Sequence, residues 1–243
     1  MKDNFSTKSA DYAKYRPVYP QEVYDFIAKQ LSQKQNAWDC GTGNGQVAVE
    51  LAKVFKKVYA TDISTQQLSH APKMANIDYS LQSAEATDFP NHHFDLVTVA
   101  QAIHWFNFDQ FYAEVKRVLK PGAIIAIIGY GLFKSNPETN KVIDHFYENI
   151  IGEYWDMERK YLDEEYKTIP FPFKEIETPK ISLQLNWNYD QLIGYLKTWS
   201  AVKHYEKANG ENPVDLIAAD LRETFGENGG ITYPILFRIG KKK

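Results

Sequence analysis

Residues 38–48 of this chain read Trp-Asp-Cys-Gly-Thr-Gly-Asn-Gly-Gln-Val-Ala, a run with a glycine at every second position from Gly41 to Gly45. Its apolar start predicts the end of a buried strand. Gly41, Gly43 and Gly45 then predict a tight turn, because glycine adopts backbone conformations that are closed to other residues. From Val47 onward, apolar residues recur at the spacing of a helix face. In an open α/β sheet, the crevice at such a strand-to-helix turn is where ligands bind.

The glycine spacing argues against a dinucleotide at this turn. A dinucleotide fingerprint is Gly-x-Gly-x-x-Gly, which places the pyrophosphate on the N-terminus of the helix. Here the third glycine, Gly45, comes one position early and Gln46 follows it. Asp39 stands two residues before the first glycine, where its charge would repel a pyrophosphate and favour an ammonium or sulfonium group. The pattern therefore favours a positively charged ligand.

The rest of the chain predicts an α/β fold. Apolar runs alternate with helical periodicity up to residue 130, which is typical of a doubly wound, mostly parallel sheet. Beyond residue 130 the pattern loosens, and we expect helices near residues 142–151, 192–199 and 214–225. The segments that we expect to be strands are 57–62, 77–81, 94–100, 123–129, 181–185 and 231–239.

Composition limits the function classes. A chain of 243 residues with a formal net charge of -3 has no electrostatic footprint for nucleic acid. A single cysteine excludes an intrachain disulfide. The N-terminus lacks the apolar run of a signal peptide, and the longest apolar run is far below the roughly 20 residues of a membrane helix. We expect a cytoplasmic protein without nucleic-acid or membrane partners.

The histidines and the cysteine predict no further chemistry. His92 and His93 share a turn, but no ligands at metal-like spacing accompany them, so no metal site is expected. Cys40 lies between the strand and the turn, and the sequence places no activating base beside it. We therefore expect Cys40 to be a small buried hydrophobe.

The motifs taken together resemble those of class I S-adenosylmethionine-dependent methyltransferases. The closest similarity is to the small-molecule branch, which includes trans-aconitate methyltransferases and is typified by the methyltransferase type 11 domain. Residues 15–20 (Tyr-Arg-Pro-Val-Tyr-Pro) and 198–201 (Thr-Trp-Ser-Ala) resemble the trans-aconitate branch in particular. The stretches that carry the general resemblance are 39–45, Asp62, Ala84-Glu85, 94–100 and 119–122.

The resemblance implies a fold and a domain organisation. It implies a Rossmann-like, seven-stranded sheet whose last strand is antiparallel, with helical insertions. We expect a single methyltransferase domain over residues 1–243, acting as a monomer or a homodimer. Within it, residues 1–130 would bind the cofactor, residues 131–230 would form the acceptor side, and residues 231–239 would form the final strand.

The resemblance also implies S-adenosyl-L-methionine as the cofactor. Asp62, at a strand end, can accept hydrogen bonds from both ribose hydroxyls, although a turn or helix-capping role is the alternative. Ala84 and Glu85 would border the adenine, and Glu85 could equally be a solvated loop residue. Gln101 would face the cofactor near its sulfur. The full set that we expect at the cofactor is Tyr15, Asp39, Gly41, Thr42, Gly43, Asp62, Ile63, Ala84, Glu85 and Gln101.

Two residues are expected to act on the methyl acceptor. Arg16 offers a forked, permanently charged donor for a carboxylate, with a surface ion pair as the alternative. His104 could orient an acidic substrate, act as a base, or cap the following helix. A carboxylate, with a pKa of roughly 4, needs no base at neutral pH, whereas a phenol, with a pKa of about 10, does.

The acceptor class remains open at this stage. The resemblance favours a carboxylate oxygen of a small organic acid similar to trans-aconitate. Residues 101–104 read Gln-Ala-Ile-His rather than Asn/Asp-Pro-Pro-aromatic, which counts against a DNA or protein-amide acceptor. The alternatives are a phenol, an amine or a natural-product intermediate. More remote ones are a nicotinamide-dependent oxidoreductase and a non-catalytic cofactor-binding module.

Overall fold

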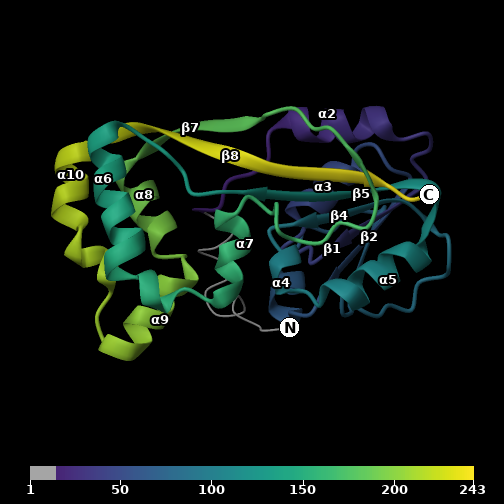
Figure 1. The fold of residues 1–243 in the computed structure, drawn as a ribbon, viewed down its shortest axis with the longest axis horizontal. Helices are drawn as coiled ribbons and strands as arrows, with labels where there is room; N and C mark the ends of the chain where they lie inside the picture. The colour runs from purple at the N-terminus through teal and green to yellow at the C-terminus, as the bar shows by residue number, and fades with distance from the viewer. Residues whose placement is uncertain (1–14) are drawn as a thin grey trace.

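The computed structural model describes residues 15–243, and an eight-stranded sheet runs through it (Figure 1). Seven strands follow the path β3-β2-β1-β4-β5-β8-β6, and β7 pairs with β8 outside that path. Strands β1 to β5 are parallel, whereas β8 runs antiparallel to β5 and β6. The doubly wound sheet and its antiparallel last strand are confirmed, and β7 confirms the strand expected at residues 181–185, whereas β6 is an eighth strand that was not expected. The strands are β1 (Asn36–Cys40), β2 (Lys57–Asp62), β3 (Ile77–Leu81), β4 (Phe94–Ala100), β5 (Leu119–Tyr130), β6 (Lys174–Ile176), β7 (Ser182–Asn188) and β8 (Asn228–Lys241).

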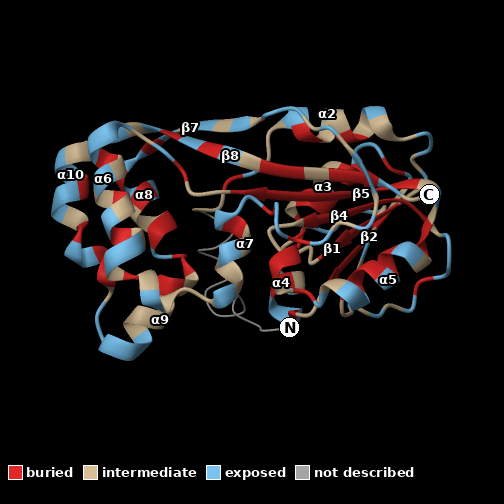
Figure 2. Cartoon of the chain, viewed as in Figure 1, coloured by how far each residue is buried: buried red, intermediate tan, exposed pale blue. Residues whose placement is uncertain are grey.

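Helices cover both faces of the parallel strands, so these strands are apolar on both sides. Alternate residues of β5 show this: Ile124 and Ile128 pack in one buried cluster, while Ile125 and Ile127 pack in another. The first cluster includes α2 (Gln21–Gln30) and α3 (Gln46–Ala52), and the second includes α5 (Phe108–Val118). Figure 2 shows the resulting band of buried residues along β1, β4 and β5.

Local capping fixes where the helices beside the sheet begin. The Ser64 hydroxyl accepts a hydrogen bond from the backbone N–H of Gln67 at 3.3 Å and so caps the start of α4 (Thr65–Ser69). The Asn107 side chain caps α5 by accepting from the Gln110 N–H at 3.1 Å. Because Asn107 performs this role, the capping role considered for His104 is not observed.

Strand β8 links the sheet to a helical part of the molecule. It pairs with β5 from Ile235 onward and with β7 up to Pro234. Helices α6, α8, α9 and α10 gather at the end of the molecule where β8 begins (Figure 1). Phe133, Phe146 and Trp199 belong to the aromatic core of this part. The elements of this region are α6 (Pro137–His145), a π-helix (Phe146–Ile150), short 3-10 turns (Gly152–Tyr154, Met157–Arg159 and Pro213–Leu216), α7 (Lys160–Asp163), α8 (Tyr189–Leu196), α9 (Ser200–Asn209) and α10 (Ala218–Phe225).

Two strand boundaries differ from the sequence-based expectation. Strand β5 already begins at Leu119, so residues 120–122 lie within it rather than before it; Gly122, at φ +76°, permits this irregular start. Strand β8 extends beyond residues 231–239 at both ends, because β7 and β6 provide additional pairing partners. Over residues 15–243 no helix is both long enough and apolar enough to cross a membrane.

Candidate active site

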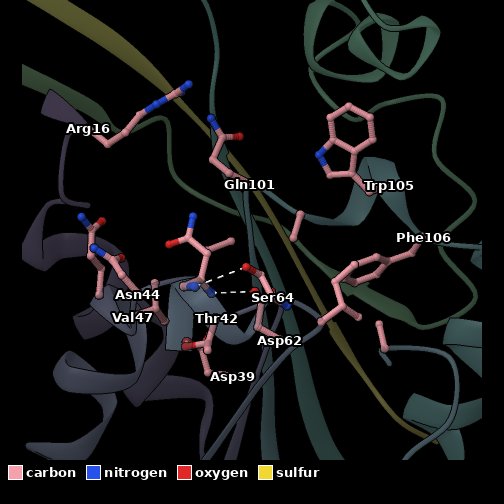
Figure 3. A pocket seen from close by; sticks show the side chains of 18 of the residues that line it. Arg16, Asp39, Thr42, Asn44, Val47, Asp62, Ser64, Gln101, Trp105 and Phe106 are labelled. Atoms are coloured by element: carbon pink, nitrogen blue, oxygen red, sulfur yellow. Dashed lines mark hydrogen bonds between the residues drawn. The ribbon is translucent and has the colours of Figure 1, made fainter. Parts of the chain in front are cut away.

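An open cleft lies at the carboxyl ends of β1, β2 and β4, where the sequence places the ligand. It encloses about 1040 Å³ of space, counted out to the open solvent. Figure 3 shows part of its lining, with Asp39 and Asp62 at the bottom of the view and Arg16, Gln101 and Trp105 at the top. The candidate residues that line the cleft are Arg16, Asp39, Gly41, Thr42, Gly43, Asp62, Ile63, Ala84 and Gln101. Tyr15, Glu85 and His104 are not among the lining residues.

The glycine turn forms one wall of this cleft, as its sequence predicts. All three glycines have positive φ angles, and Gly45, at φ +84°, immediately precedes α3. A Cβ atom at Gly41 would lie 2.7 Å from the Cβ of Ala102, so only glycine fits between β1 and the segment after β4. A Cβ atom at Gly43 would meet nothing within 4 Å. The turn therefore leaves room for a ligand to approach its backbone.

Asp39 lies beneath the turn and is only 1% exposed. Its carboxylate accepts hydrogen bonds from the hydroxyls of Thr42 at 2.5 Å and Thr98 at 2.8 Å. Burial raises the pKa of Asp39 to about 6 and outweighs these two hydrogen bonds, which lower it. At neutral pH the group is mostly ionised, so a negative charge is held at the base of the cleft.

Asp62 connects the glycine turn to the end of β2. Its Oδ2 accepts from the Gly43 N–H at 2.8 Å, and its Oδ1 accepts from the Ser64 N–H at 2.9 Å. An ionised carboxylate offers about four acceptor positions, so holding the turn does not by itself prevent the group from accepting hydrogen bonds from ligand hydroxyls. Asp62 can therefore both stabilise the glycine turn and accept hydrogen bonds from ribose hydroxyls.

Apolar side chains form another part of the lining. Ile63 follows Asp62, Ala84 follows β3, and Trp105 and Phe106 follow β4. They provide a surface suited to a flat aromatic ring. Glu85 lies outside this wall, because its carboxylate accepts hydrogen bonds from Ser83 and from the backbone N–H of Asn107 at the start of α5.

Arg16 reaches the cleft from the N-terminal side. Its guanidinium donates to the Tyr130 hydroxyl at 3.1 Å and to the Thr198 carbonyl at 3.5 Å, and it lies over the Tyr195 ring. Among the residues described, Arg16 is the only basic side chain in the cleft lining. Tyr15 packs instead beside Gly194 in the helical part, where its ring would lie within 3 Å of a Cβ atom at that glycine.

His104 is buried behind the cleft rather than in it. The side chain lies in a 3-10 turn (Ile103–Trp105) and is 6% exposed. Burial, assisted by the positive charge of Arg159, lowers the pKa of His104 to about 3. The imidazole is therefore neutral at physiological pH.

The cleft lining includes further residues, of which Gln67 and Gln82 were not singled out from the sequence. Trp105 follows His104 directly in the chain, and its side chain lines the cleft where that of His104 does not. Gln67 follows β2 and Gln82 follows β3 in the chain. Their position after a strand end was the feature of the sequence that could have indicated a place in the cleft. Tyr130 ends β5 and approaches the cleft beside Arg16.

The described residues also bear on metal binding and on the cysteine. In the part of the chain that the structure describes, no group of three or more histidine, cysteine or acidic residues could hold a metal ion. Cys40 is completely buried, and burial raises the pKa of its thiol well above the ordinary value. A buried neutral thiol suits the structural role expected from the sequence.

The donor set fits a nucleoside ligand that carries a positive charge. Asp62 can hold ribose hydroxyls, Ile63 and Ala84 border an apolar slot, and Gly43 leaves the turn backbone open. The buried charge of Asp39 favours a cation and would repel the pyrophosphate of a dinucleotide. The fold and the site thus define an α/β protein with a cleft for a cationic nucleoside cofactor.

Comparison with known proteins identifies the family. The methyltransferase domain family matches residues 38–127. A Dictyostelium discoideum protein with a provisional methyltransferase name is 36% identical over 99% of this chain and 95% of its own length. A structure from Anaeromyxobacter dehalogenans, provisionally described as a type II methyltransferase, is 36% identical, covers 93% of this chain and 98% of its own, and superposes with a TM-score of 0.86.

A more distant structure shows the fold with its cofactor. The phosphoethanolamine N-methyltransferase 2 of Haemonchus contortus, in complex with S-adenosyl-L-methionine, has a TM-score of 0.50. It is 18% identical, and the match covers 98% of this chain and 57% of that one. The chain belongs to the class I S-adenosylmethionine-dependent methyltransferases. It is an enzyme, and its cofactor is S-adenosylmethionine.

Proposed function

We propose that this enzyme methylates a carboxylate oxygen of a small organic acid, and that Arg16 binds the acid. The position of Arg16 carries the proposal. It is a fixed positive charge in the cleft lining, and the Tyr130 hydroxyl and the Thr198 carbonyl orient its guanidinium. A guanidinium fork matches the geometry of a carboxylate.

The remaining lining supports an acceptor that needs no base. Among the described residues of the cleft lining there is no histidine, lysine or glutamate. Its two carboxylates, Asp39 and Asp62, accept hydrogen bonds from the turn or its supports. A carboxylate acceptor is already ionised at neutral pH, whereas a phenol or an ammonium group would have to lose a proton first.

We assign the cofactor residues as follows. Asp62 would hold the ribose, Ile63 and Ala84 would border the adenine, and the backbone of Gly41 and Gly43 would approach the methionine part. S-Adenosylmethionine supplies an electrophilic methyl group on a sulfonium. The protein then has to align the acceptor with that methyl, exclude water and avoid overstabilising the ground state.

Transfer of a labelled methyl group to a panel of acceptors tests the proposal. We expect di- and tricarboxylic acids to be methylated, and phenols and amines not to be. Methyl esters release methanol when treated with alkali, whereas aryl ethers and methylamines do not. An alkali-stable product formed from a phenol or an amine would overturn the proposal.

Substitution of Arg16 tests the binding role. Arg16→Met should raise the KM for the acid roughly 10- to 100-fold, because a hydrogen bond to a charged group is worth about 1.5–3 kcal/mol. Arg16→Lys keeps the positive charge but loses the forked geometry of the guanidinium. Its KM for the acid should lie between those of the wild type and Arg16→Met. Arg222 lies over the Tyr189 ring and pairs with Glu227 away from the cleft, so Arg222→Met is the matched control. Equal KM values for Arg16→Met and the control would contradict the role.

A further inference from the structure

A cluster of buried polar groups lies directly behind the wall of the cleft. Gln101, at the end of β4, has φ +52°, which is unusual for a residue other than glycine. Its backbone N–H donates to the Ile128 carbonyl on β5 at 2.9 Å. Such a conformation persists only where the surroundings enforce it, and it occurs preferentially at functional sites.

The hydrogen bonds of Gln101 fix the orientation of its amide. Its Nε2 donates to the Tyr130 carbonyl at 3.2 Å, and its Oε1 accepts from the Tyr166 hydroxyl at 3.2 Å. A backbone carbonyl can only accept, so the nitrogen must face Tyr130 and the oxygen must face Tyr166. The amide nitrogen carries a second hydrogen, and Gln101 lines the cleft.

Tyr166 reaches this position from a distant part of the sequence. It follows α7, has φ +61° directly after Glu165 at φ +55°, and is completely buried. Its backbone N–H donates to the Tyr161 carbonyl at 2.7 Å, and its own carbonyl accepts from Arg238 on β8 at 2.9 Å. These bonds hold the ring in place. Gly129 leaves space for it, because a Cβ atom there would lie 2.7 Å from the Tyr166 ring and 3.0 Å from the Gln101 Oε1.

His104 supports Tyr166 from behind. Its Nδ1 lies 3.5 Å from the Tyr166 hydroxyl, at the outer limit of a hydrogen bond, and its ring stacks with that of Tyr166. The Tyr166 hydrogen is directed to Gln101, so the Tyr166 oxygen is the acceptor for the His104 side chain. A neutral imidazole with its hydrogen on Nδ1 completes a chain from His104 through Tyr166 to Gln101.

We propose that Tyr166 is a positioning residue, which holds the Gln101 amide so that its second N–H donates to the reacting carboxylate of the acceptor. The acceptor role rests on the proposed function above. A neutral N–H can orient a carboxylate oxygen without neutralising its charge, whereas pairing that oxygen with a guanidinium would weaken it as a nucleophile. Arg16 then binds the acid, and Gln101 aligns its reacting carboxylate with the methyl group. His104 is assigned to the support of Tyr166 instead of proton transfer.

Tyr166→Phe removes only the hydroxyl and is the main test. In it we expect the KM for the methylated acid to rise about five- to tenfold, as the loss of one neutral hydrogen bond implies. The affinity for S-adenosylhomocysteine, measured by calorimetry, should stay unchanged. Tyr112→Phe is the matched control, since Tyr112 is also buried but its hydroxyl has no hydrogen-bond partner within residues 15–243.

A double-mutant cycle distinguishes positioning from general destabilisation. Because Tyr166 acts through Gln101, Tyr166→Phe should have no further effect on the KM in a Gln101→Met background. Additive effects of the two substitutions would overturn the positioning role. So would an unchanged KM in the single Tyr166→Phe variant.

A spectroscopic measurement tests the positioning without any acceptor. In a 15N-labelled protein, the side-chain amide signals of Gln101 are those that disappear in Gln101→Met. Tyr166→Phe should shift these signals, and Tyr112→Phe should not. Unshifted signals would overturn the positioning role. If the signals shift but the wild-type enzyme methylates no acid, then the proposed function and the acceptor role of Gln101 fail together, while the positioning of Gln101 by Tyr166 stands.

Discussion

At the scale of single residues, Asp39 shows a conflict between stability and binding. Its carboxylate is buried, and burial raises its pKa from 3.8 to about 6 despite two hydroxyl donors. The charged form of Asp39 is therefore less favourable in the folded protein than in the unfolded chain. The same charge suits a sulfonium or ammonium group in the cleft. The buried carboxylate therefore lowers the stability of the fold but favours binding of a cationic ligand.

The sign of this conflict gives a testable pH dependence. A folded pKa above the unfolded one means that the native state binds the proton more tightly, so stability falls as the pH rises from about 4 to about 6. The full loss for a shift of this size is about 3 kcal/mol. Asp39→Asn removes the titration but weakens one hydroxyl contact. It should therefore raise the free energy of unfolding at pH 7 by about 1–2 kcal/mol, measured by urea denaturation without cofactor.

The same variant should bind the cofactor less well. The affinity of Asp39→Asn for S-adenosylmethionine, measured by calorimetry, should fall by about tenfold or more because the counter-charge is lost. In the wild-type protein this affinity should decline from pH 7 to pH 5 as Asp39 becomes protonated, and in the variant that decline should be absent. A variant that is less stable at pH 7, or that binds the cofactor as tightly as the wild type, would contradict this account of Asp39.

At the scale of elements, the strand–turn–helix unit from β1 to α3 depends on close packing at Gly41. This residue combines φ +67° with an approach to Ala102, whose Cβ is fixed to the backbone and cannot rotate away. The end of β1 and the segment after β4 are thereby brought together at the cleft. Backbone strain and steric crowding should each lower the free energy of unfolding when Gly41 is replaced. Substitutions can measure the two contributions separately.

Gly41→Ala should destabilise the protein by about 2–5 kcal/mol, as measured by urea denaturation. About 1–2 kcal/mol comes from the left-handed backbone, and about 1–3 kcal/mol comes from overpacking against Ala102. Gly210→Ala isolates the first contribution, since Gly210 has φ +78° and a Cβ atom there would meet nothing within 4 Å. Combining Gly41→Ala with Ala102→Gly removes the crowding, so the double variant should regain the stability lost to overpacking. If Gly41→Ala cost no more than Gly210→Ala, crowding at the turn would be excluded.

At the scale of the whole molecule, local sequence patterns predicted the cofactor half. Strands 57–62 and 94–100 agree with β2 and β4 residue for residue, because both are short apolar runs between clear turn signals. The glycine turn and Asp62 also lie together as expected, since the carboxyl ends of neighbouring parallel strands meet at one edge. The hydrogen bond between Gly43 and Asp62 spans only 19 residues of sequence.

The other half depends on contacts that no local pattern encodes. Strand β6 was not expected, because it has only three residues and joins the sheet through long-range pairing that places Lys174 opposite Lys241 on β8. Tyr166 contacts Gln101 across 65 residues of sequence, and a left-handed aromatic residue has no sequence signature. His104 was singled out for its position after β4, but its exclusion from the cleft follows from side-chain direction, which the pattern does not specify.

Cofactor binding should be visible as a change in the stability of the whole molecule. The cleft joins β1, β2 and β4 to Arg16, which also contacts Tyr130 and the helical part through the Thr198 carbonyl. A ligand that binds only the folded state at 100 times its Kd adds about 2.7 kcal/mol to the free energy of unfolding. For a chain of this size, S-adenosylmethionine should raise the melting temperature by about 5–10 °C.

Two comparisons make this melting experiment specific. NAD should give no shift, because its pyrophosphate would meet the buried charge of Asp39. Asp62→Ala should fold but lose most of the shift produced by S-adenosylmethionine, because its carboxylate both holds the Gly43 turn and faces the cleft. An equal shift with NAD would refute the electrostatic account of the cleft. An undiminished shift in Asp62→Ala would leave that account intact and remove Asp62 from the cofactor site, so the two ligands and one variant separate charge from hydrogen bonding.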